Sequence, residues 1–209
     1  MGVALKVCGL TRRADLELCI EMGVDAVGLN FWPRSKRALN LADAEALLRG
    51  VDRKRTKILG VFVEASAGTV AGIVRSFGLD GVQLHGDQVW EDFAEIGAPL
   101  VRVIRGTPAL AELSPPRPAP AWTILDAAVD GYGGKGHKTD WQWATEAVQV
   151  LAPAPVWLAG GIRPDNAVQA IEQVAPAGLD VASGVELEGA SRGEKDPAKI
   201  AALLSACRA

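Results

Sequence analysis

The chain has 209 residues, of which 49% are hydrophobic and 22% are charged, and its formal net charge at pH 7 is -3. This length suits one domain with a single large core, since chains split into domains beyond roughly 250 residues. The mild acidity argues against nucleic acid as a partner, because nucleic-acid binding leaves a clustered basic face. Its apolar runs are shorter than the roughly 18 residues of a membrane span. Cys8, Cys19 and Cys207 fit neither a disulfide framework nor a metal site, so we expect a reduced, soluble, cytoplasmic protein without a metal.

Eight apolar runs of strand length follow one another along the chain. They span residues 4–9, 26–31, 57–63, 81–86, 99–105, 122–127, 155–161 and 178–184. Stretches with helical spacing separate most of these runs, and residues 166–175, for example, place Val168, Ile171 and Val174 on one predicted face. Strands that alternate with helices predict a parallel sheet.

Eight such units in a chain of this length predict a single closed (β/α)8 barrel, a TIM barrel, over residues 1–209. An open doubly wound sheet is the alternative. The turn after the first strand reads CGLTRRAD and lacks the G-x-G-x-x-G pattern of such sheets, so the closed barrel is favoured.

The connection between the fifth and sixth strands breaks this rhythm. Residues 106–122 contain five prolines, a density that helix interiors do not tolerate. We therefore expect the fifth helix to be reduced to an irregular Pro-rich segment, with at most one turn around Ala109–Leu113. A linker between two domains is the other interpretation, but neither half alone would close a sheet.

Reactive side chains stand where the predicted strands end, which is where this fold carries its catalytic groups. In the first strand Leu5 and Val7 share one face, suited to packing on helices, so Cys8 points to the barrel axis. The same alternation turns His85 and Asp126 toward the axis. We expect these three side chains to converge on one mouth, with His85 either contacting substrate or holding the rim together.

Charged residues are also predicted inside the barrel. Lys6, Arg102 and Asp180 share its interior in this interpretation, where an unpaired charge is costly. We expect them to form a paired cluster; a contact between Asp180 and substrate is the alternative.

Two glycine-containing turns indicate a phosphate site. Gly160–Gly161 follow the seventh strand, and Ser183–Gly184 follow the eighth and could open a short extra helix. Glycines let backbone N–H groups approach an anion closely, and the loops after strands seven and eight form the usual phosphate site of such barrels.

Several motifs occur in order, one per barrel unit. They read KVCGLT, FWPRSKR, GVFV, VQLHG, ILDA, LAGGIRPDN and DVASGVE. Together, from Lys6 to about Asp196, they resemble the phosphoribosylanthranilate isomerase family of tryptophan biosynthesis.

This resemblance implies an Amadori rearrangement of N-(5-phosphoribosyl)anthranilate, an aminoaldose, to an aminoketose, without a cofactor. It assigns Cys8 as general base, Asp126 as general acid and Arg37 as the contact to the anthranilate end. The turns at Gly160–Gly161 and Ser183–Gly184 would grip the phosphate. The chemistry asks for the same types, because ring opening needs a protonated acid and C2 deprotonation needs a base. A thiol acts as a base only as thiolate, so a positive group should lie near Cys8.

The loop after the sixth strand departs from the family pattern. Lys135 stands where a small hydroxyl residue is expected, and Thr139 stands where phenylalanine is common. These departures bear on loop closure and turnover, and not on the type of reaction.

Two alternatives to this isomerase remain. One is another phosphosugar isomerase on the same fold, such as the histidine-pathway Amadori isomerase, which uses aspartate where this chain has Cys8. The other is a non-catalytic barrel that binds a phosphorylated ligand, although such a binder needs neither Cys8 nor Asp126. In each case the expected partner is a phosphorylated small molecule, and the protein is expected to be a monomer or homodimer.

Overall fold

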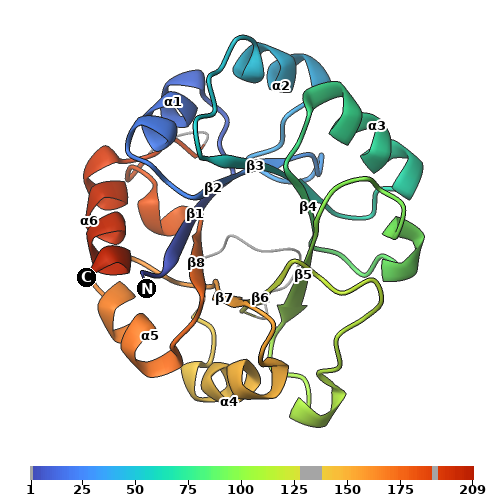
Figure 1. Ribbon diagram of the computed structural model, residues 1–209. Coiled ribbons are helices and arrows are strands. Elements are labelled where there is room, and N and C mark those ends of the chain that lie inside the picture. The colour runs from blue at the N-terminus through green and yellow to red at the C-terminus, as the bar shows by residue number, and fades with distance from the viewer. Residues whose placement is uncertain (1, 128–137, 190–192) are drawn as a thin grey trace.

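The computed structural model describes residues 2–127, 138–189 and 193–209. Eight parallel strands form a closed barrel in which each strand pairs with its neighbours in chain order and β8 returns to β1 (Figure 1). The strands are β1 (Ala4–Cys8), β2 (Ala26–Asn30), β3 (Lys57–Phe62), β4 (Gly81–Leu84), β5 (Leu100–Arg105), β6 (Trp122–Asp126), β7 (Val156–Leu158) and β8 (Gly178–Val181). The predicted (β/α)8 barrel is confirmed, and strands seven and eight end three residues earlier than expected.

Helices surround the ring of strands on its outer side (Figure 1). They are α1 (Arg13–Glu21), α2 (Leu41–Leu48), α3 (Ala67–Phe77), α4 (Trp141–Leu151), α5 (Ala167–Val174) and α6 (Pro197–Arg208). Four of them begin after a capping residue (Asn40, Ser66, Asp140 or Asp196) whose side chain accepts a hydrogen bond from a backbone N–H of the first turn.

Two connections contain only short 3₁₀ turns. The expected reduction of the fifth helix is confirmed, since that segment contains only the turn Leu110–Glu112. The connection from β4 to β5 is reduced in the same way, to the turn Trp90–Phe93, which the sequence analysis did not anticipate. Gly97, with φ +77°, and Pro99 follow this turn directly before β5, and neither favours a longer helix there.

The buried face of α5 differs from the prediction. Ala167, Ala170 and Val174 are buried, whereas Val168 is 52% exposed. Of the predicted stripe, Val174 is buried and Ile171 packs against the core, so the prediction is wrong for Val168 alone.

The alternation of side chains divides the core into two layers. Leu5 and Val7 belong to the outer layer between strands and helices, as predicted. The inner layer fills the barrel and consists of Ala26, Leu59, Val101, Trp122, Ile124, Trp157 and Ala159. Trp122 and Trp157 stack there with ring centroids 5.0 Å apart.

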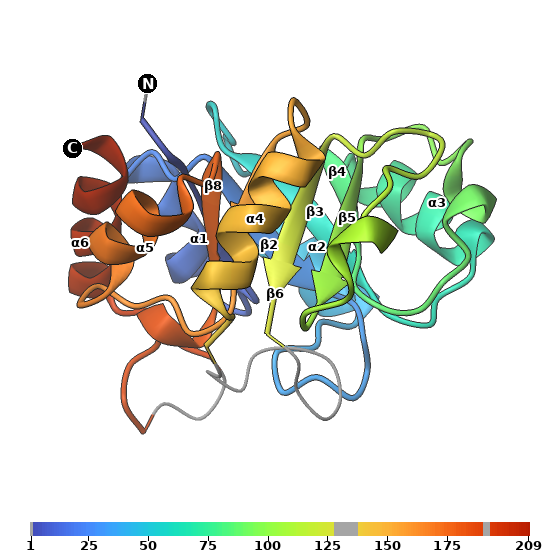
Figure 2. The same ribbon diagram turned by 90° about the horizontal axis from the view of Figure 1, so that it is seen from below.

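The carboxyl ends of the strands gather at one rim. In Figure 2 the strand arrows point toward this lower rim, where the loop after β2 and the segment after β8 extend. Parallel strands bring residues far apart in sequence to this one edge, and Cys8, Asp126 and the turns after β7 and β8 all belong to it. None of the helices in the described ranges has the length and apolar character needed to cross a membrane.

Candidate active site

Cys8 is the last residue of β1, and its thiol lies beside a buried ammonium group. Cys8 is the register partner of Gly28 in β2. A Cβ atom on Gly28 would lie 2.8 Å from the Cys8 sulfur and 3.1 Å from Lys6 Nζ, so the thiol and the ammonium flank the same point of the inner barrel wall. The absence of a side chain at Gly28 gives both groups their room.

The Lys6 ammonium forms an ion pair inside the barrel. Lys6 and Asp180 are register partners in β1 and β8, and Lys6 Nζ donates to Asp180 Oδ1 at 2.8 Å. Burial opposes the charge on Lys6, but its interactions with the Asp180 carboxylate and with Cys8 outweigh burial and raise the pKa of Lys6. The group beside Cys8 is therefore a cation at neutral pH.

Arg102 does not join this pair, contrary to the prediction. Its neighbour Val101 belongs to the inner layer, so Arg102 points away from the axis. There its Nη1 donates to the backbone oxygen of Ser114 at 2.8 Å.

Asp126 ends β6 and is buried, with 8% of the residue exposed. The pKa of Asp126 is raised to about 6, chiefly by burial and also by the Asp180 carboxylate. The N–H of Ala127 and the cations Lys6 and Arg105 act in the opposite direction. Asp126 therefore holds a proton closer to neutrality than an ordinary carboxyl group does.

His85 follows β4 and lies beside Asp126. Its Nε2 is 3.5 Å from Asp126 Oδ2, and its Nδ1 is 3.1 Å from Gln83 Nε2. The pKa of His85 is lowered to about 4, chiefly by burial and also by the charges of Lys6 and Arg105, so the ring is neutral at pH 7. Within the described part of the chain Nε2 is buried and makes no hydrogen bond.

Arg37 comes from the loop after β2 and is buried, with 6% exposure. Its side chain passes over Gly9, which has φ +74° and where any Cβ would overlap the Arg37 chain. Arg37 Nε donates to Glu186 at 2.5 Å. Its Nη2 is buried without a hydrogen-bond partner among the described residues, so it remains able to bind an anionic ligand.

The two glycine-containing turns lie in contact with each other. Gly160 and Gly161 have φ values of +81° and +69°, which favour glycine. Ser183 and Gly184 open a short 3₁₀ turn, Ser183–Val185, and a Cβ on Gly184 would overlap the carbonyl oxygen of Ile162. The predicted short helix is reduced to this 3₁₀ turn, and the contact requires glycine at position 184.

Of the two departures in the loop after β6, the structure describes one. Thr139 is buried, and its hydroxyl donates to the backbone oxygen of Ala159 at 2.8 Å, joining the end of this loop to the end of β7. Lys135 lies outside the described residues.

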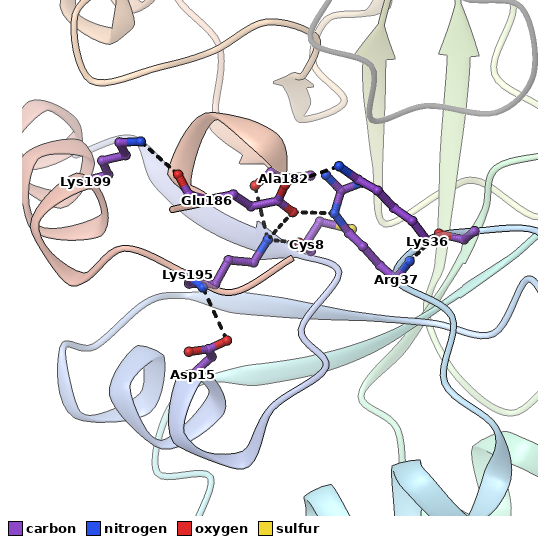
Figure 3. Close-up of polar contacts among 9 residues, drawn as sticks. Cys8, Asp15, Lys36, Arg37, Ala182, Glu186, Lys195 and Lys199 are labelled. Carbon is purple, nitrogen blue, oxygen red and sulfur yellow. Dashed lines mark hydrogen bonds and ion pairs between the residues drawn. The ribbon is translucent and has the colours of Figure 1, made fainter. Parts of the chain in front are cut away.

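Sequence reasoning missed two charged residues at this rim, Glu186 and Lys195. Both contact site residues, as Figure 3 shows. The sequence does place both residues near the rim, because Glu186 is the last residue of the DVASGVE motif and Lys195 precedes the start of the last helix. Neither residue carries a spacing that identifies its partner.

The rim therefore combines a thiol next to a cation, a carboxyl group with a raised pKa, and an arginine with a free donor. These groups suit proton transfer to and from an anionic substrate.

A model of the family described as N-(5'phosphoribosyl)anthranilate (PRA) isomerase matches residues 5–206. The chain belongs to this family. The PRA isomerase of Myxococcus xanthus is 41% identical over 212 residues, which span 100% of this chain and 97% of that protein. The PRA isomerase structure from Thermotoga maritima is 29% identical, with a TM-score of 0.83 over 98% of both chains.

A further PRA isomerase structure contains reduced 1-(o-carboxyphenylamino)-1-deoxyribulose 5-phosphate. It is 27% identical to this chain, with a TM-score of 0.80 over 98% of both chains. The expected identity as an isomerase of tryptophan biosynthesis on a (β/α)8 barrel is thus confirmed.

Proposed function

We propose that this PRA isomerase performs the Amadori rearrangement with Asp126 as general acid and Cys8 as general base. This assignment rests on the ion pair between Lys6 and Asp180 inside the barrel. The Lys6 ammonium lies beside the Cys8 sulfur, and the Asp180 carboxylate helps to raise the pKa of Asp126. The pair places an ammonium beside the proposed base and a carboxylate that helps to keep the proposed acid protonated, as acid–base chemistry at one substrate requires.

The first step opens the furanose ring. Asp126 donates its proton to the ring oxygen as the bond between C1 and that oxygen breaks, and the nitrogen lone pair forms the C1=N iminium. The raised pKa of Asp126 keeps a fraction of this carboxyl protonated near neutral pH.

The second step removes a proton from C2. The iminium acidifies this proton, and the Cys8 thiolate takes it while the C–H electrons form the C1=C2 bond and neutralise the nitrogen. The enolamine then gains a proton at C1 and loses the one on its C2 oxygen, which yields the aminoketose. The Lys6 ammonium lies beside the Cys8 sulfur in this step.

The remaining residues bind and orient the substrate. The free Nη2 of Arg37 suits the anthranilate carboxylate, and the backbone of Gly160, Gly161, Ser183 and Gly184 suits the phosphate. Neutral His85, next to Asp126, contacts the sugar.

The test follows the fluorescence of the anthranilate group as purified protein consumes freshly made phosphoribosylanthranilate. Loss of the general base or acid should lower kcat about a hundredfold or more in Cys8→Ala and Asp126→Asn. Both variants should still bind the reduced product analogue, because the phosphate and carboxylate contacts remain. Cys207→Ala removes a thiol in α6 and serves as the matched control. Wild-type turnover in Cys8→Ala would refute the base assignment.

We also propose that the chain works as one domain in the cytoplasm. Its cysteines are free, and the thiolate chemistry assigned to Cys8 needs a reducing compartment. Light scattering on the purified protein distinguishes a monomer from a homodimer.

A further inference from the structure

Lys195 is a buried cation that binds three parts of the active-site rim at once. Its Nζ donates to the backbone oxygen of Cys8 at 2.9 Å and to that of Ala182 at 3.1 Å. The third acceptor is Glu186 Oε1 at 3.3 Å. Cys8 is the proposed base, and Ala182 immediately precedes the proposed phosphate turn, so one ammonium joins two functional segments (Figure 3).

Holding a cation in this place is costly. Lys195 is 2% exposed, and burial lowers its pKa despite the opposing charge of Glu186. An apolar side chain of similar size would fill the space without that cost. An apolar side chain could not donate the three hydrogen bonds that the ammonium of Lys195 donates.

Glu186 connects Lys195 to Arg37 through its carboxylate. Its Oε1 accepts from both Lys195 Nζ and Arg37 Nε, and Lys36 Nζ lies 3.5 Å from Oε2. Figure 3 shows Glu186 between Lys195 on one side and the loop that carries Lys36 and Arg37 on the other. Burial opposes ionisation, but the Arg37 hydrogen bond and the nearby cations outweigh it and lower the pKa of Glu186 to about 2.

The guanidinium group is thus held by its Nε edge. Glu186 uses the Nε hydrogen of Arg37, and the buried Nη2 has no partner among the described residues. A planar guanidinium fixed at one edge presents its other donors in a set direction, which suits a carboxylate.

We propose that Glu186 and Lys195 are positioning residues: Lys195 holds Glu186, and Glu186 aims Arg37 at the carboxylate of the substrate. The same ammonium sets the Cys8 backbone relative to the phosphate turn. This inference rests on the proposed function, in which Arg37 binds that carboxylate.

The test compares two substrates, phosphoribosylanthranilate and the analogue made by condensing ribose 5-phosphate with aniline, which lacks the carboxylate. Glu186→Gln keeps the shape of the side chain and removes its charge. It should raise KM for the anthranilate substrate about tenfold, the usual size of a lost charged hydrogen bond, with a smaller effect on kcat. With the aniline substrate the same variant should match wild type within about twofold, since no carboxylate is there to be aimed at.

Lys195→Met should raise KM for the anthranilate substrate and also lower kcat, because it frees the Cys8 carbonyl, and Lys195→Arg should restore part of both. Lys199→Met is the matched control: Lys199 donates to the backbone oxygen of Glu186 at 2.8 Å and does not bind its carboxylate. This control should keep the wild-type KM.

An equal penalty on both substrates, or no penalty on either, would overturn the inference. If Lys195→Met does not fold, Glu186→Gln alone decides between these outcomes, and if Glu186→Gln does not fold, Glu186→Asp, which keeps the charge on a shorter arm, decides in the same way. A wild-type protein that consumes neither substrate would instead refute the proposed function.

Discussion

Replacing Asp126 by asparagine should stabilise the protein while it removes the activity. The Asp126 carboxyl has a pKa of about 6 in the folded protein against an ordinary value of 3.8, chiefly because burial opposes its charge. Ionised Asp126 therefore destabilises the folded state. Asparagine has the same shape, stays neutral at every pH and can still accept the N–H of Ala127 that Asp126 accepts at 2.8 Å.

The size and the sign of this effect follow from linkage. At about 1.36 kcal/mol per pH unit, the difference between the two pKa values corresponds to about 3 kcal/mol. Below pH 3.8 the group is protonated in both states and nothing is lost. As pH rises from 3.8 to 6 the unfolded chain loses the proton first, so wild-type stability falls, and above pH 6 the full loss is present. Asp126→Asn should therefore exceed wild type by about 3 kcal/mol at pH 8 and by about half of that at pH 5.

Urea unfolding of both proteins at pH 5, 6, 7 and 8 measures this difference. The advantage of Asp126→Asn should grow with pH up to about pH 7 and then level off. The same change at Asp165, whose side chain is 75% exposed, should give no such trend. An advantage of equal size at pH 5 and pH 8 would refute the electrostatic reasoning, since only a change in packing is independent of pH.

Three further predictions concern the rim. Lys6→Met should slow the alkylation of Cys8 by iodoacetamide several-fold at pH 7.5, as followed by mass spectrometry. It should also lower the free energy of unfolding by about 3 kcal/mol, because Asp180 loses its partner. An unchanged alkylation rate would exclude Lys6 as the group that promotes the reactivity of Cys8. Gly184→Ala should raise KM in kinetic assays and lower the free energy of unfolding in urea by about 1–3 kcal/mol, because the added methyl overlaps the turn after β7. A wild-type KM would argue against a phosphate contact at this turn. Glu186, with its pKa lowered to about 2, contributes stability above its ordinary 4.5 that is lost as pH falls through 2. Glu186→Gln should accordingly be less stable than wild type at pH 7 and approach it near pH 2.5, and a constant gap in urea unfolding would contradict this.

Much of the fold could be predicted because strand position and strand alternation are local properties of the sequence. The eight apolar runs coincide with the eight strands, and five prolines suffice to exclude a fifth helix. The contact face of α5 was wrong at Val168, because helical spacing alone does not show which neighbouring positions pack on the sheet, and Ala167 and Ala170 are buried there instead.

The positions of site residues could be predicted where the residue ends or directly follows a strand. Cys8, His85 and Asp126 follow from position and parity, and the family motifs point to Arg37. Arg102 was misplaced because a parity argument depends on which residue of β5 faces inward, and Val101 takes that place.

The contacts that hold Arg37 could not be predicted from local sequence. Arg37 and Glu186 lie 149 positions apart in the chain, and Lys195 and Cys8 lie 187 positions apart. Each pair meets only because the barrel closes and brings the segment after β8 next to β1 and the loop after β2. Long-range ion pairs of this kind have no periodicity in the sequence.

The Lys6–Asp180 pair is a buried ion pair whose presence in the barrel needs a physical reason. Replacing a buried ion pair with apolar residues of similar volume is often neutral or stabilising, so stability alone does not account for it. This pair acts in two directions: its ammonium lies beside the Cys8 thiol, and its carboxylate helps burial to raise the pKa of Asp126. An apolar pair would remove the ammonium beside the Cys8 sulfur and leave Asp126 less inclined to hold its proton. In the proposed mechanism the general base and the general acid thus share one mouth because a single internal ion pair sets an ammonium beside the base and a carboxylate near the acid.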